Sequence, residues 1–129
     1  MQGLMQDRPL LVSSIIEHAA VNHGTVPVVS LTVEGHTVTS NYAEVALRSR
    51  KTAQALERLG AKFGDRIGTL AWNTHRHVEA WYGISGMGCV THTINPRLFE
   101  EQILYIINHA EDRFLLFDLS FIGIVEKIA

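Results

Sequence analysis

The second half of the chain alternates between short apolar runs and longer segments with apolar residues at helical spacing. The short runs lie near 66–71, 89–93 and 113–117, about 24 residues apart, and each suits a buried strand. Between them, residues 74–86 and 100–110 repeat apolar positions every three to four residues. This order predicts right-handed crossovers and a parallel sheet with helices packed on it. We therefore expect an α/β fold: a three-layer open sheet with a parallel β-α-β-α-β core.

Two further elements are expected at the start of the chain. Apolar residues recur at helical spacing from Leu10 until Gly24 ends a first helix. Apolar and polar residues then alternate from Pro27, and Glu34-Gly35 is a turn signal. A helix followed by a β-hairpin is the predicted structure.

The clearest helix of the chain is predicted over 41–60, directly before the sheet core. Asn41 is a favourable N-cap and Glu44 follows three residues later, the pattern of a capping box. Gly83 and Gly86, in the next helix, each cost about 1 kcal/mol relative to alanine. We expect that helix to approach a sheet closely at the two glycines.

Composition and charge restrict the class of protein. The 129 residues are 47% hydrophobic and 19% charged, which suits one domain with a core. A net charge of −2 gives no field that attracts nucleic acid. Cys89 is the only cysteine, so an internal disulfide is impossible. The sequence has no secretory signal and no integral membrane segment, and we expect a cytoplasmic protein.

Residue chemistry alone identifies no active site. Gly83, Gly86 and Gly88 close a helix before a strand, the reverse of the order in dinucleotide-binding motifs. His75 and His77 are two residues apart, so they point in different directions on a helix, and no other metal ligand stands at a matching offset.

Four further titratable residues accompany the expected second and third strands. His92 lies in the second strand and is either a hydrogen-bonded core histidine or a residue that lines a substrate channel. Glu111, Asp112 and Asp118 flank the third strand. We expect solvated carboxylates at element ends there, in place of an acid–base pair.

Several motifs along the chain resemble one enzyme family. The most specific is His92-Thr93-x-Asn95-Pro96-Arg97-Leu98. The others are Tyr42-Ala43-Glu44-Val45, Gly64-Asp65-Arg66 with Asn73, Arg76-His77-x-Glu79-Ala80, Gly86-Met87-Gly88, Gln102-Ile103 with Tyr105-Ile106, Asn108-His109-Ala110-Glu111-Asp112, and the lead-in 1–17. In these motifs the chain resembles the N-terminal region of the AMP-forming acyl-CoA synthetases, especially the long-chain fatty-acid CoA ligases.

The resemblance implies a function for the whole enzyme. Such a ligase joins a fatty acid to ATP with the help of Mg²⁺, releases pyrophosphate, and transfers the acyl group from the adenylate to CoA. The family's phosphate loop and C-terminal domain would lie beyond Ala129. We therefore expect 1–129 to be a single partial domain, an N-terminal fragment that acts as scaffold, is inactive alone and binds no ATP, Mg²⁺ or CoA.

The resemblance also suggests where this fragment would approach a substrate. Asn95, Pro96 and Arg97 follow the second strand, and with His92 they would lie in the vicinity of the tunnel for the pantetheine arm of CoA. The family's N-terminal part implies a homo-oligomer, and peripheral contact with a membrane stays open. One departure is Phe99-Glu100, which stands where the family usually places Ser or Thr and then Pro, so a weaker helix cap is expected.

Two alternatives from other functional classes remain. The chain could be a free-standing module that retains the ligase sheet as a dimerisation or interaction surface, without catalysis. It could also be a compact nucleotide-binding module.

Overall fold

The centre of the molecule is a parallel three-stranded sheet. The computed structural model describes residues 3–128. Strands β3 (Arg66–Leu70), β4 (Val90–Thr93) and β5 (Phe114–Phe117) lie in the order β4-β3-β5 and run parallel. The predicted β-α-β-α-β core is confirmed, with each strand one residue shorter than expected.

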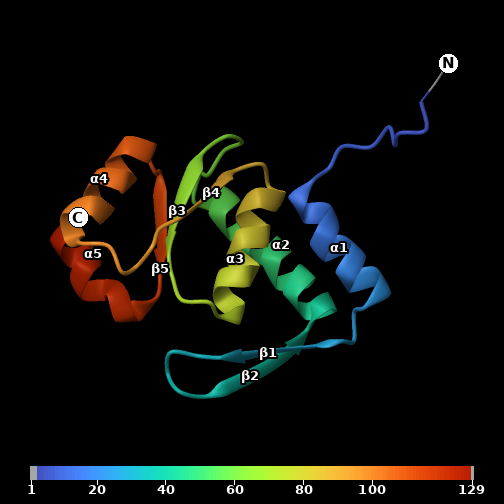
Figure 1. The fold of residues 1–129 in the computed structure, drawn as a ribbon, viewed down its shortest axis with the longest axis horizontal. Helices are drawn as coiled ribbons and strands as arrows, with labels where there is room; N and C mark the ends of the chain where they lie inside the picture. Colours follow the sequence, from blue (N-terminus) through green and yellow to red (C-terminus); the bar gives the residue numbers. More distant parts are fainter. Residues whose placement is uncertain (1–2, 129) are drawn as a thin grey trace.

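Two pairs of helices cover the two faces of this sheet, as Figure 1 shows. Helices α2 (Tyr42–Arg58) and α3 (His75–Gly86) lie on one face, and α4 (Glu100–Ala110) and α5 (Ile122–Ile128) lie on the other. The core on the α2–α3 side contains Leu56, Ala61, Ile67, Ile84 and Cys89. The core on the α4–α5 side contains Leu70, Ile94, Ile103 and Phe121. The sheet is therefore the middle of three layers, as predicted.

The remaining elements lie outside these layers. Helix α1 (Val12–Asn22) packs against α2 and α3, and strands β1 (Pro27–Leu31) and β2 (Thr37–Asn41) form a separate antiparallel hairpin (Figure 1). A 3₁₀ turn, η1 (Leu119–Phe121), precedes α5. No helix within residues 3–128 has the length and apolar character needed to cross a membrane.

The helix caps follow the sequence. Oδ1 of Asn41 accepts a 2.9 Å hydrogen bond from the backbone N–H of Glu44, which confirms the N-cap of α2. At the start of α4, the backbone N–H of Phe99 donates to Oε1 of Gln102 at 3.2 Å. The phenylalanine ring itself cannot accept a hydrogen bond, so this cap keeps only half of a capping box.

The hairpin turns Val29 and Leu31 away from the rest of the molecule. Val29 and Leu31 are 65% and 69% exposed, whereas Ser30 and Thr32 are 8% and 4% exposed. The alternation in the sequence is real, but its polar side is the covered one. The reason is that Ser30 makes a hydrogen bond to α3, described below, and the Thr32 hydroxyl donates to the carbonyl oxygen of His36 in the hairpin at 3.0 Å.

Gly83 marks a close contact between two helices, which corrects the expected approach to a sheet. A Cβ at Gly83 would lie 2.6 Å from the carbonyl oxygen of Ser49 and 3.0 Å from Cβ of Thr52, both on α2. A Cβ at Gly86 would meet nothing closer than Cβ of Ser13 at 3.7 Å. Gly83 therefore sets the distance between α2 and α3, and Gly86 does not.

Candidate functional site

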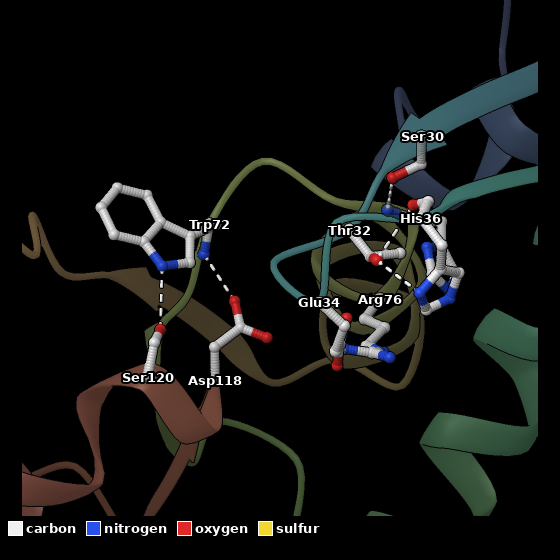
Figure 2. A network of polar contacts seen from close by, with 9 residues as sticks. Ser30, Thr32, Glu34, His36, Trp72, Arg76, Asp118 and Ser120 are labelled. Atoms are coloured by element: carbon white, nitrogen blue, oxygen red, sulfur yellow. Dashed lines mark hydrogen bonds and ion pairs between the residues drawn. The ribbon is translucent and has the colours of Figure 1, made fainter.

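Open α/β sheets bind ligands at the carboxyl ends of their strands. Helices α3 and α5 leave β3 and β5 toward opposite faces, the arrangement at which such sheets place ligands. Here the two strand ends are joined by hydrogen bonds: Oδ2 of Asp118 accepts the Trp72 backbone N–H at 2.7 Å, and the Trp72 indole donates to Oγ of Ser120 at 2.9 Å (Figure 2). Asp118, expected to be solvated, is only 7% exposed. That expectation was wrong because the Asp118 carboxylate turns inward to accept the hydrogen bond from the Trp72 backbone.

The hairpin holds the other side of the same loop (Figure 2). Oγ of Ser30 accepts the backbone N–H of His75 at 3.0 Å. Thr74 occupies the N-cap position of α3, yet its hydroxyl makes no hydrogen bond within residues 3–128. Arg76 donates to Glu34 at 2.7 Å, and this hydrogen bond is the largest of the causes that lower the pKa of Glu34 to about 2. Residues distant in sequence therefore fix the start of α3.

A groove of about 530 Å³ opens between β1 and α3, beside the end of β4. Its lining is mostly apolar and includes Val28, Val78 and Trp81. His77 also lines it and lies 3.0 Å from the hydroxyl of Thr69 through Nε2. Burial lowers the pKa of His77, so its imidazole is neutral at pH 7. A neutral histidine beside apolar side chains suits packing against an apolar group.

His92 and Asp112 form a polar pair that crosses the middle of the sheet. Nδ1 of His92 lies 2.7 Å from Oδ2 of Asp112, and the two side chains are 24% and 1% exposed. The hydrogen bond expected of a core histidine is present, and the alternative that His92 lines a substrate channel stays a prediction. The prediction that Asp112 is solvated was wrong, because its carboxylate turns inward toward this imidazole. Glu111, the residue before Asp112, is exposed and forms an ion pair with Arg66 at the surface.

The loop after β4 contains the other expected site residues. Asn95 and Arg97 are exposed and Pro96 is partly buried. The Asn95 side chain accepts the backbone N–H of Arg97 at 3.0 Å, which closes a turn soon after the strand. The preceding Ile94 anchors it, because its N–H continues the ladder to the carbonyl of Thr69 at 2.9 Å. The loop thus presents an amide and a guanidinium at the carboxyl edge of the sheet.

Sequence reasoning missed the role of Ser30 at this edge, and it missed the role of Asp112, which precedes β5 at the opposite end of the strands. Nothing near Ser30 indicates that it caps a helix 45 residues later. A signal for Asp112 did exist: Gly68 lies in the middle of a central strand, where a glycine often marks a close approach by another group. A search for groups near Gly68 would have required the fold.

Within residues 3–128, no group of three or more His, Cys, Asp or Glu side chains is arranged to hold a metal ion. The residues at the sheet edge can orient a ligand by hydrogen bonds from a loop and an imidazole. We assign them no bond-making step.

Comparisons with known proteins agree with this arrangement. A family model described as AMP-binding enzyme matches residues 16–127. A 3-methylmercaptopropionyl-CoA ligase of Ruegeria lacuscaerulensis is 52% identical over 99% of this chain and 24% of its own length. A long-chain-fatty-acid–CoA ligase of Thermus thermophilus is 44% identical over 96% of this chain and 23% of its own length. The chain therefore spans about a quarter of the length of these curated relatives.

A solved structure gives the same fold. The inhibitor-bound N-terminal domain of FACL13 from Mycobacterium tuberculosis matches with a TM-score of 0.83 and 19% identity, over 91% of this chain and 29% of that chain. At this identity the likeness concerns the fold alone. Because the family model covers most of the sequence, the chain belongs to the AMP-binding enzyme family.

Proposed function

We propose that this chain is the N-terminal subdomain of an AMP-forming acyl-CoA ligase and serves it as scaffold. The observation that carries the proposal is 52% identity along 99% of the chain to a ligase of which the match covers only 24%. The hydrogen bond between Trp72 and Asp118 supports a structural role, since it joins the ends of β3 and β5 where such sheets usually place a ligand.

The cofactors divide between this chain and the rest of the proposed enzyme. ATP and Mg²⁺ would be held by the other three quarters, because no metal-ligand cluster is found within residues 3–128 and the sequence has no phosphate-binding loop. CoA would pass near the loop Asn95, Pro96 and Arg97, whose exposed amide and guanidinium suit a polar arm. When bound, CoA supplies the thiol that displaces AMP from the acyl group.

The acyl group is proposed only as a class. The names of the relatives at 52% and 44% identity refer to a short thioether acid and to long-chain fatty acids. Both names describe acids with an aliphatic chain. We therefore propose an aliphatic acid as substrate, and the long-chain preference stays a prediction.

A chimera tests the proposal. Residues 1–128 of this chain replace the matching residues of the Ruegeria lacuscaerulensis ligase, and acid-dependent ATP–pyrophosphate exchange is measured with acids of increasing length. We expect exchange by the chimera, and none by the 129-residue chain or by the remaining three quarters of the relative alone. Robust exchange by the 129-residue chain, or an inactive but folded chimera, would contradict the proposed function.

The outward apolar face of the hairpin favours a second candidate, a free-standing dimerisation module. Val29 and Leu31 expose apolar surface on one side of a two-stranded sheet, and such patches often mark interfaces. We expect the chain to self-associate in sedimentation velocity, and Val29→Lys with Leu31→Lys to shift it toward monomer. A monomer at high concentration would contradict both this module and the predicted homo-oligomer.

A further inference from the structure

The His92–Asp112 pair depends on the absence of a side chain at one position of the central strand. His92 lies on β4 and Asp112 directly precedes the segment that becomes β5, so β3 stands between them. Gly68 is the β3 residue in register with His92. A Cβ at Gly68 would lie 2.9 Å from Oδ2 of Asp112, closer than side-chain carbons pack. The carboxylate reaches the imidazole because the central strand has no side chain at this position.

The pair stabilises the sheet less than apolar side chains in the same space would. Oδ1 of Asp112 is buried and has no hydrogen-bond partner within residues 3–128. A buried acceptor without a partner costs stability, and an apolar residue of similar size would fill the same space without that cost. This points to a role in orienting the imidazole.

The carboxylate selects one tautomer of the ring. An ionised carboxylate only accepts hydrogen bonds, so the neutral imidazole must carry its proton on Nδ1. Nε2 then has a free lone pair. Nε2 makes no hydrogen bond within residues 3–128, and it is not among the buried atoms that lack a partner. Nε2 is therefore an acceptor of fixed direction that is not fully buried.

We propose that Asp112 is a positioning residue that holds His92 in the Nδ1–H tautomer, so that Nε2 accepts a hydrogen bond from an amide N–H of the pantetheine arm of CoA. The second half of the proposal rests on the proposed function. His92 precedes the Asn95 loop by three residues, roughly 10 Å along a strand, which is less than the length of an extended pantetheine arm. The amide N–H groups of that arm are donors, and a donor is what a deprotonated Nε2 requires.

The first test measures the tautomer in the 129-residue chain. Long-range ¹H–¹⁵N spectra at pH 8.5 distinguish a protonated from an unprotonated ring nitrogen for each histidine. We expect a protonated Nδ1 for His92, and the more common Nε2–H form for the exposed His23. A His92 ring in the Nε2–H form in the unmodified chain overturns the proposal, and no variant is needed for that result.

Variants identify the cause of the tautomer. Asp112→Ala removes the acceptor, and Gly68→Ala displaces it without removing its charge, so both should shift His92 toward the Nε2–H form. Glu111→Gln alters the neighbouring exposed carboxylate and should leave the ring unchanged. If folded Asp112→Ala protein retains the Nδ1–H form, Asp112 is not the positioning residue.

The second test uses the chimera and separates the two half-reactions. His92→Phe and Asp112→Ala should raise the KM for CoA by about tenfold, the value of one good hydrogen bond, and should lower ATP–pyrophosphate exchange by a smaller factor. His92→Gln restores an acceptor near the Nε2 position and should keep the KM of the unmodified chimera. An unchanged KM in His92→Phe, or an equal loss in both half-reactions, overturns the CoA assignment. A chimera with no exchange at all refutes the proposed function and this assignment with it, while the spectra still decide the tautomer.

Discussion

Replacing Gly83 by leucine is expected to cost about 3 kcal/mol of unfolding free energy, at the upper end of the usual cost of overpacking. A Cβ alone would already lie 2.6 Å from the carbonyl oxygen of Ser49, and the remaining side-chain atoms would have to enter α2. Helices α2 and α3 must then separate, which loosens the core between them and the sheet. Urea unfolding of the variant and the unmodified chain measures the difference.

An alanine pair is the matched control for this prediction. Gly83→Ala should still destabilise the chain, by about 1 kcal/mol or more, because its Cβ meets a backbone atom. Gly86→Ala lies in the same helix with nothing nearer than 3.7 Å, and should be neutral or add up to about 1 kcal/mol through helix propensity. Equal effects at the two positions would show that propensity, and not the contact with α2, governs this helix.

The sequence predicted the sheet well because short apolar runs, which form the strands, alternate along the chain with amphipathic segments, which form the helices. Ile67 and Leu70 are buried on opposite faces of β3, and only a strand covered on both sides places them so. The covered face of the hairpin was harder to predict. Alternation shows which residues share a face, but which face is covered depends on the neighbours. Ser30 is covered because it bonds to α3, a contact over 45 residues.

The candidate site was predictable in part. The motif from His92 to Leu98 indicated the family, and the loop lies at the carboxyl edge where α/β sheets present ligand-binding groups. The partner of His92 was not predictable, because Asp112 reaches it across a third strand. Such a contact requires the strand order β4-β3-β5, and periodicity along the chain gives strands without their order.

A second large effect is expected when His92 alone is replaced by leucine. Asp112 is 1% exposed at its side chain, so the loss of its partner leaves a buried carboxylate unpaired, at a cost of about 3–5 kcal/mol at pH 7. Asp112→Asn should cost only about 1 kcal/mol, because the amide oxygen can still accept from Nδ1 and carries no charge.

The double variant completes a thermodynamic cycle. With Asn at position 112, no charge is buried, and we expect His92→Leu to cost about 1–2 kcal/mol, the penalty of an unpaired neutral group. The difference between the two backgrounds measures the coupling of the pair, and urea unfolding of the four proteins at one pH provides it. A cost of His92→Leu that is the same in both backgrounds would mean that water or another group already compensates the carboxylate. In that case the imidazole would lack a single fixed acceptor, and its orientation could not be attributed to Asp112.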